Sequence, residues 1–168
     1  MKIGLISDTH GYLDPKVFDY FKDCEQLWHA GDIGSMKVLD QLMKFKPTLA
    51  VYGNIDGREL QAVCPKDLKF DCEGLQVWIT HIGGRPGRYD REVKQELYRD
   101  PPDIFVCGHS HILKVMVDAK LKKMLYLNPG AAGNQGFHRV KTLLRFEVAS
   151  GKATNMEVIE LGKRGALS

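Results

Sequence analysis

The sequence predicts an α/β fold in which two mixed β-sheets pack face to face as a sandwich and α-helices flank them. The strand–helix–strand–helix–strand alternation over residues 2–52 favours a parallel sheet with helices packed on it. Residues 113–159 are rich in strand patterns, which a second sheet accommodates. The length of 168 residues and the hydrophobic content of 43% suit a single domain spanning 1–168.

The first half of the chain alternates apolar runs with helix signals. Lys2–Ser7 is a short apolar run typical of a buried strand. Asp14 is a suitable N-cap and Pro15 a suitable first helical residue, so a helix is predicted over 14–23. The same reasoning predicts strands at 27–30 and 48–52, with a helix capped by Ser35 between them.

The second half contains mainly strand patterns. Two strands at 67–72 and 75–80 are joined by a tight turn, and Asp90 is expected to cap a helix. Leu143, Phe146 and Val148 do not alternate strictly, which leaves the burial of their strand open. The other predicted elements are a short helix at 56–63, strands at 103–107, 113–118, 123–127, 140–148 and 153–159, and a frayed tail at 162–168.

Composition excludes several classes of protein. The net charge of +3, from 24 basic and 21 acidic residues, is too small to indicate a nucleic-acid or membrane partner by itself. The four cysteines form no CxxC pair, which argues against a zinc knuckle and a disulfide scaffold and favours a reducing compartment. No stretch approaches the roughly 18 apolar residues of a membrane span. We therefore expect a cytoplasmic protein that does not enter a membrane.

Candidate metal ligands stand just past the ends of five predicted strands. Ligand sites of open α/β sheets lie outside the carboxyl ends of the strands, so these side chains are expected to meet. Gly31, Gly53 and Gly108 are expected to let the backbone turn sharply there. The candidate ligands are Asp8, His10, Asp32, Asn54, His81, His109 and His111.

The ligand types indicate which ions the site would bind. Imidazole and carboxylate suit Zn, Fe, Mn or Ni better than Ca. Seven ligands are too many for one four-coordinate zinc ion, and they suit two cations that share a carboxylate. If Asp8 and His10 lie in an extended segment, their side chains point the same way and can converge on one ion. His109 and His111 have the same spacing.

These motifs, taken in order, resemble the calcineurin-like metallophosphoesterases. The chain carries Asp-x-His, Gly-Asp, Gly-Asn-x-Asp, a lone His after a strand and Gly-His-x-His between about residues 2 and 133. The opening Ser7-Asp8-Thr9-His10 is most similar to the small bacterial and archaeal phosphodiesterase branch, which includes the vacuolar-sorting scaffold subunit of retromer. The resemblance implies an αββα sandwich.

The resemblance also implies roles for the seven residues. A hydroxide held between two divalent metal ions would attack phosphorus, with Mn as the expected metal and Zn, Fe or Ni as alternatives. Asn54 and His81 would form the catalytic shell around substrate and metal. The first metal would take Asp8, His10 and His111, the second Asn54, His81 and His109, and Asp32 would bridge them.

Two positions depart from the family pattern. Many members have a His after the Asn that is thought to protonate the leaving group, and Ile55 stands there in this chain. That substitution argues against monoesters and poor leaving groups. The usual His-Gly-His is His81-Ile82-Gly83, so a second His that often supports the first metal is missing. The first metal site is therefore expected to be looser.

Other polar segments admit two interpretations each. Arg85, Arg88 and Arg91 form either a solvated loop or a clamp for phosphate. Asn128–Gly133 is either a plain turn or, as in the family, a segment near the metals with a backbone contact to substrate. Asp56 either orients His10 or starts a helix facing solvent. His29 and His138 are expected to be structural, and Trp28 and Trp78 are expected in the core.

The sequence thus favours an enzyme, a metal-dependent phosphodiesterase acting on a small phosphodiester. The alternative is a non-catalytic protein-interaction scaffold of the same fold. Scaffold members tend to lose metal ligands, whereas all seven positions here carry competent side chains. A nuclease is less favoured, because no clear nucleic-acid surface is visible. The oligomeric state, including a homo-oligomer, stays open.

Overall fold

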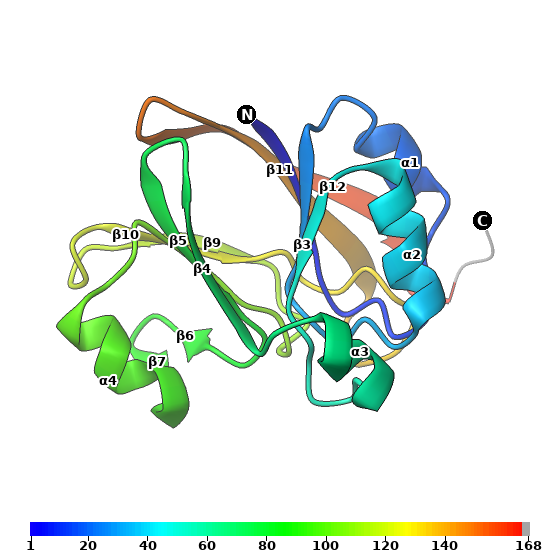
Figure 1. Ribbon diagram of the computed structural model, residues 1–168, viewed down its shortest axis with the longest axis horizontal. Coiled ribbons are helices and arrows are strands. Elements are labelled where there is room, and N and C mark those ends of the chain that lie inside the picture. The colour runs from blue at the N-terminus through cyan, green and yellow to red at the C-terminus, as the bar shows by residue number, and fades with distance from the viewer. Residues whose placement is uncertain (166–168) are drawn as a thin grey trace.

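A computed structural model describes residues 1–165 of the chain. Two five-stranded sheets face each other, and helices lie on the outer side of each (Figure 1). The first sheet has the order β12-β11-β1-β2-β3 and the second β4-β5-β8-β10-β9. Both mix parallel and antiparallel pairs. The predicted fold class is therefore confirmed.

The first sheet has a parallel centre, as the alternation in the sequence predicts. β1, β2 and β3 run parallel, and the hairpin of β11 and β12 adds antiparallel to β1. Helices α1, α2 and α3 cover its outer face (Figure 1). The elements are β1 (Lys2–Ile6), α1 (Lys16–Tyr20), β2 (Gln26–His29), α2 (Met36–Phe45), β3 (Thr48–Ala50), α3 (Arg58–Val63), β11 (Val140–Ala149) and β12 (Lys152–Lys163).

The second sheet carries one helix on its outer face. β5, β8 and β10 are parallel, whereas β4 and β9 are antiparallel edge strands. A two-stranded hairpin lies between this sheet and α4 (Figure 1). The elements are β4 (Asp67–Cys72), β5 (Leu75–Thr80), the hairpin strands β6 (Gly84–Arg85) and β7 (Arg88–Tyr89), α4 (Arg91–Arg99), β8 (Ile104–Val106), β9 (Lys114–Asp118) and β10 (Met124–Asn128).

Three apolar clusters hold the layers together. One lies under α1, α2 and α3, a second between the sheets and a third between the second sheet and α4. Trp28 belongs to the second cluster and Trp78 to the third, and both are buried as expected. Among the described residues no helix is both long and apolar enough to span a membrane.

The helix caps agree with the sequence at two sites and differ at a third. Ser35 accepts the backbone N–H of Val38, and Asp90 accepts that of Glu92. The helix predicted over 14–23 is shorter and spans only α1, Lys16–Tyr20. Asp14 does accept the backbone N–H of Lys16, but its other oxygen is drawn to Lys141 Nζ at 2.8 Å. A long-range ion pair therefore positions this residue.

The last hairpin explains the irregular apolar pattern of its sequence. Register shifts interrupt the β11–β12 pairing between Lys141 and Thr142 and between Arg145 and Glu147. Leu144, Phe146 and Val148 face the cluster between the sheets, and Leu143 faces the cluster under the helices. Both faces of β11 are therefore buried, and this is why its apolar residues do not alternate strictly with polar ones. β12 extends to Lys163, so the expectation of fraying from 162 is wrong for its first residues. Residues 166–168 of that tail lie outside the described residues.

All four cysteines are buried free thiols. Burial raises the pKa of Cys24 and of Cys64 to about 11. Burial also raises the pKa of Cys107 to about 12 and that of Cys72 above its ordinary value. Each thiol thus remains protonated and inert in the folded protein.

Candidate metal centre

The predicted ligands converge at the edge where the carboxyl ends of the strands meet. Six of them form two groups, and within each group one ligand atom from every residue lies within 4.8 Å of the others. The seventh is Asn54, whose Oδ1 lies 3.1 Å from His81 Nε2. The first group is Asp8, His10 and His111, and the second is Asp32, His81 and His109.

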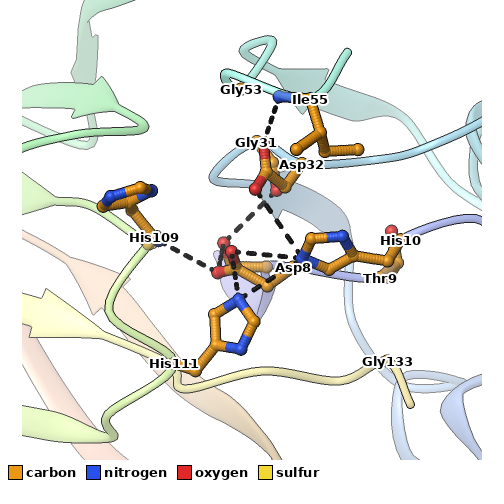
Figure 2. Close-up of polar contacts among 12 residues, drawn as sticks. Asp8, Thr9, His10, Gly31, Asp32, Gly53, Ile55, His109, His111 and Gly133 are labelled. Atoms are coloured by element: carbon orange, nitrogen blue, oxygen red, sulfur yellow. Dashed lines mark hydrogen bonds and ion pairs between the residues drawn. The ribbon is translucent and has the colours of Figure 1, made fainter. Parts of the chain in front are cut away.

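Asp8 presents one oxygen to the first group and anchors the other. Its carboxylate is fully buried, and Oδ2 accepts hydrogen bonds from Ser7 Oγ at 2.6 Å and the His109 backbone N–H at 3.1 Å. Oδ1 has no hydrogen-bond partner, although it lies 3.2 Å from His111 Nε2 and 3.9 Å from His10 Nε2 (Figure 2). A buried carboxylate oxygen without a partner is costly, and a cation would satisfy it.

Asp32 faces both groups. Its Oδ1 lies 3.2 Å from His81 Nε2. Its Oδ2 lies 3.6 Å from His10 Nε2, a contact that Figure 2 shows. The backbone N–H of Ile55 donates to Oδ1 at 3.1 Å, which fixes the carboxylate between the two groups. This position is the one that a carboxylate shared by two cations would need.

A backbone carbonyl determines which nitrogen His81 offers. His81 Nδ1 lies 2.7 Å from the carbonyl oxygen of Ala30, which can only accept, so Nδ1 carries the proton. Nε2 is then the nitrogen that faces Asp32 and Asn54, and it can bind a metal when it carries no proton. Burial opposes the charged form of His81, but the hydrogen bond to Asp32 and the charges of Asp8 and Asp32 outweigh it and raise its pKa.

The pKa values of Asp32 and His109, the other residues of the second group, are also shifted. Burial raises the pKa of Asp32, but its hydrogen bond to His81 and its contact with Ile55 N–H outweigh burial, so the net shift is downward. Burial and the neighbouring His81 lower the pKa of His109. Because a divalent cation binds the neutral imidazole, its binding would displace the proton that Asp32 favours on His81.

Five of the seven ligands adopt the left-handed backbone region. This corrects the expectation of extended segments: Asp8 has φ 54° and His10 has φ 49°. The side chains converge because the chain turns, and residues in this region cost about 1–3 kcal/mol each unless their surroundings hold them. Backbone bonds hold them here, from Asp8 N to Gly31 O and from His10 N to Asp32 O. The other three are Asp32, His109 and His111.

The three glycines are needed chiefly for space. A Cβ on Gly53 would lie 2.1 Å from Asp32 Oδ1, and one on Gly108 would lie 2.1 Å from Ser7 Oγ. Only Gly31 also has a positive φ, of +93°, and there a Cβ would meet His81 Nδ1 at 2.6 Å. The backbone therefore passes directly against the ligands, which side chains at these positions would displace.

Asp56 does not contact His10, so its proposed orienting role is wrong. It is 2% exposed, so it does not face solvent either. Its carboxylate accepts the backbone N–H groups of Ile33, Gly34 and Gly53 at 3.0, 2.7 and 2.8 Å. Asp56 thus ties together the loops that carry Asp32 and Asn54.

The segment Asn128–Gly133 supports the ligand loops. Asn128 Nδ2 donates to the carbonyl of Gly108 at 2.9 Å and to Ser110 Oγ at 3.1 Å, beside His109. The backbone N–H of Gly133 donates to the carbonyl of Asp8 at 3.0 Å. The plain-turn interpretation is therefore wrong.

Two histidines outside the predicted set differ in their surroundings. His29 is fully buried between Thr9 Oγ1 and the Gly31 N–H, and burial lowers its pKa to about 4, in keeping with a structural role. His138 packs its ring against His111 at 5.2 Å between centroids, and its Nε2 lies 2.9 Å from the Gly133 carbonyl. Its distance along the chain from every motif concealed this contact.

The residues present fit two divalent cations. Three residues leave an atom that can bind a metal pointing inward. These atoms are the Asp8 oxygen without a hydrogen bond, the Asp32 carboxylate oxygens shared by the two groups, and Nε2 of His81, whose proton is fixed on Nδ1. The donors are imidazole nitrogens, carboxylates and one amide oxygen, which suit transition metals. Ile55 is 47% exposed beside Asp32 and offers no titratable group (Figure 2).

Sequence comparison finds named relatives of similar length. A probable metallophosphoesterase of Methanothermobacter thermautotrophicus is 32% identical over 136 residues, covering 78% of this chain and 77% of the relative. A phosphodiesterase of Methanocaldococcus jannaschii is 28% identical over 146 residues, covering 77% of this chain and 83% of the relative.

Solved structures share the fold at lower identity. An archaeal phosphodiesterase has a TM-score of 0.76 at 23% identity and covers 96% of this chain and 100% of its own. Vps29 of Chaetomium thermophilum has a TM-score of 0.72 at 17% identity, over 97% of this chain and 99% of its own. The model of the calcineurin-like phosphoesterase superfamily domain matches residues 1–151. Motifs, fold and comparisons agree, and the chain belongs to the calcineurin-like phosphoesterase superfamily.

Proposed function

We propose that this protein is a phosphodiesterase that works with two divalent metal ions. One ion would be held by Asp8, His10 and His111, the other by Asn54, His81 and His109, and Asp32 would be shared. The observation that carries the proposal is Asp32, which turns one carboxylate oxygen towards each group. The relative named a phosphodiesterase supports the reaction class.

The metals' chemistry would be that of other two-metal hydrolases. When bound, the two ions supply an activated water and positive charge for the phosphoryl oxygens. The donor types suit Mn, and Zn, Fe or Ni equally match imidazole and carboxylate.

The chain's own residues set the geometry of the reaction. The Ala30 carbonyl keeps the proton on His81 Nδ1, so that Nε2 stays available to the second ion. Ile55 N–H keeps Asp32 between the groups. Because the Ile55 side chain donates no proton, the leaving oxygen departs with little assistance, which favours diesters with acidic leaving groups.

The test compares Asp32→Asn with wild type on bis(p-nitrophenyl) phosphate at saturating Mn²⁺. Loss of a carboxylate that both ions share should lower turnover at least about a hundredfold. Asp40→Asn, an exposed carboxylate on α2, is the matched control and should match wild type. Turnover of Asp32→Asn near wild type would overturn the site. An absence of Mn²⁺-dependent hydrolysis in the wild-type protein would favour the scaffold alternative.

A further inference from the structure

A cavity of about 910 Å³ opens beside the second ligand group. Its lining residues come from the hairpin of β6 and β7, the start of α4 and the loop after β8. His109 and Ser110 line one side of it. His109 also belongs to the second ligand group, so the cavity adjoins the metal centre.

The cavity is lined by four basic side chains without counter-charges. Arg85, Arg88, Arg91 and Lys114 all line it, and Asp90 is its one acidic lining residue. Asp90 is engaged as the cap of α4. Within residues 1–165 none of the four basic side chains makes a hydrogen bond or an ion pair with another residue. This surplus of positive charge is local, because the chain as a whole carries only +3.

Two of these arginines are placed against each other. Arg85 and Arg88 are direct cross-strand partners in the hairpin. Like charges directly opposite on paired strands destabilise the pair, and an anion between them relieves this repulsion. The hairpin was not predicted from sequence, where the segment appeared only as a Gly- and Pro-rich loop.

The hairpin is fixed to the second sheet rather than free to move. Tyr126 Oη donates to the Gly84 carbonyl at 2.7 Å, and Tyr89 Oη donates to Asp118 Oδ2 at 2.7 Å. Gly84 has φ +74°, and a Cβ there would lie 2.5 Å from Asp90 N. The arginines are thus held on an anchored frame beside His109, which lowers the ordering cost of binding.

A second, smaller cavity lies on the other side of Ile82. It has a volume of about 310 Å³ and is lined by Asn54 and His81 from the metal centre. Its basic residue, Lys66, is already paired with Glu92. A phosphodiester has two ester groups, and the two cavities offer each group a different environment. The larger cavity is strongly basic, whereas the smaller one keeps the negative charge of Asp90 after Lys66 and Glu92 pair.

We propose that the basic cavity binds a second phosphate of the substrate. The substrate class is then a small phosphodiester, one of whose ester groups carries a further phosphate. Guanidinium groups match phosphate through paired N–H donors, and a volume near 900 Å³ suits a nucleotide-sized group rather than a long strand. This inference rests on the proposed function, because it places the scissile phosphate at the metal centre.

The experiment compares two esters that differ only in the extra phosphate. Thymidine 5′-(p-nitrophenyl phosphate) with and without a 3′-phosphate is assayed with Mn²⁺ on wild type, Arg85→Gln/Arg88→Gln and Lys94→Gln. Wild type should prefer the 3′-phosphorylated ester at least about tenfold in kcat/KM, mainly through KM. The double variant should lose that preference. Lys94 is an exposed residue of α4 outside the cavity, so Lys94→Gln should keep the preference for the 3′-phosphorylated ester.

A binding measurement gives a readout without turnover. Thymidine 3′,5′-bisphosphate should bind metal-free wild type in EDTA at least about tenfold more tightly than the double variant by calorimetry. A 3′-hemisuccinate in place of the 3′-phosphate tests the nature of the anion. If the hemisuccinate gives the same preference, the cavity accepts any anion and the assignment to phosphate is overturned.

The outcomes separate the two proposals. If neither ester is hydrolysed, the proposed function fails. If the plain ester is hydrolysed and the 3′-phosphate gives no advantage, or the advantage survives in the double variant, the inference about the cavity fails alone. If thymidine oligonucleotides compete increasingly well with each added nucleotide, the ligand is a nucleic-acid strand and the small-molecule assignment is overturned.

Discussion

Asp8 and Asp14 are buried carboxylates six residues apart, and they differ in the groups that contact their oxygens. Asp14 is 1% exposed, and its two oxygens meet Lys141 Nζ and the Lys16 N–H. Asp8 is 0% exposed, and its Oδ1 has no hydrogen-bond partner. A buried charge must be compensated, and Asp14 is compensated from within the chain. Asp8 Oδ1 instead faces the His111 and His10 imidazoles without a hydrogen bond, and a bound cation would complete its compensation.

The backbone repeats this contrast. Asp8 lies in the left-handed region, as do four other ligands, whereas Asp14 does not. Lys141 itself is 1% exposed and lies 5.0 Å from the Tyr12 ring centroid. Asp14, the structural carboxylate, thus has an unstrained backbone and a paired charge. Asp8, the candidate functional carboxylate, has a strained backbone and an oxygen without a hydrogen-bond partner.

The largest expected effect on stability comes from breaking the ion pair of Asp14 and Lys141. Lys141→Met leaves Asp14 buried without its partner, which should lower the free energy of unfolding by about 3–5 kcal/mol. Urea denaturation followed by circular dichroism measures this loss. Lys152→Met removes an exposed lysine of β12 and should change stability by less than about 0.5 kcal/mol.

A second variant keeps this test informative if the first fails to fold. Asp14→Leu/Lys141→Met removes both charges and should recover most of the lost stability. A loss below about 1 kcal/mol for Lys141→Met would show that the pair is not needed to compensate Asp14.

Removing the charge of Asp8 should increase stability rather than lower it. At pH 8 without metal, Asp8→Asn should raise the free energy of unfolding by about 1 kcal/mol, because an uncompensated buried charge is lost. Mn²⁺ at about a hundred times its Kd should stabilise wild type by roughly 2.7 kcal/mol for each ion bound, and Asp8→Asn much less.

Denaturation with and without Mn²⁺ measures both effects, and elemental analysis should find close to two ions per wild-type chain. If Asp8→Asn destabilises the metal-free protein as Asp14→Asn does, the contrast between the two carboxylates does not hold.

A smaller effect is expected at Ile55, beside the shared carboxylate. Ile55→His should raise turnover of alkyl diesters by about tenfold and flatten the dependence of rate on leaving-group pKa, because an imidazole can protonate the leaving oxygen. A series of substituted phenyl and alkyl diesters measures the slope. A shallow slope in wild type would show that another group already donates the proton.

The smallest effect concerns pH. Burial raises the pKa of Asp14, but the hydrogen bonds and charges of Lys141 and Lys16 outweigh it, so the net shift is downward. A lowered pKa in the folded state means that Asp14 contributes its stability above the unfolded pKa of about 3.9 and loses it as the pH falls further.

The difference in unfolding free energy between wild type and Asp14→Asn should therefore be constant from about pH 7 to 5 and shrink below about pH 4. Urea denaturation across this range checks it. A difference that instead shrinks between pH 7 and 5 would contradict the assignment to this carboxyl group.

Local patterns predict the sheets and the ligand cluster well. The alternation over residues 2–52 is enough for the parallel order of β1, β2 and β3, and the polar residues past the strand ends are enough to place the ligands together. The predicted role of Asp56 fails, and the ion pair of Asp14 is not predicted, for one shared reason. Their partners, Lys141 and the backbone N–H groups of two loops, are distant in sequence and leave no local signal.

Backbone conformation is the other feature that the sequence conceals. Asp and His adopt a positive φ more often than most residues but still rarely, so their identity alone does not predict it at Asp8 or His10. The hairpin of β6 and β7 is equally hidden, because each strand has only two residues and the residues that anchor it, Asp118 and Tyr126, lie elsewhere in the fold.

The four buried thiols give the protein a built-in probe of its own opening. Cys24 and Cys64 lie in the cluster under α1, α2 and α3, Cys72 between the sheets, and Cys107 under α4. At pH 8 a thiol of pKa 11 is ionised about one time in a thousand, so an alkylating reagent reacts only after its layer opens. Alkylation rates measured at each cysteine by mass spectrometry would therefore rank the three apolar clusters by the free energy of their local unfolding, without any introduced label.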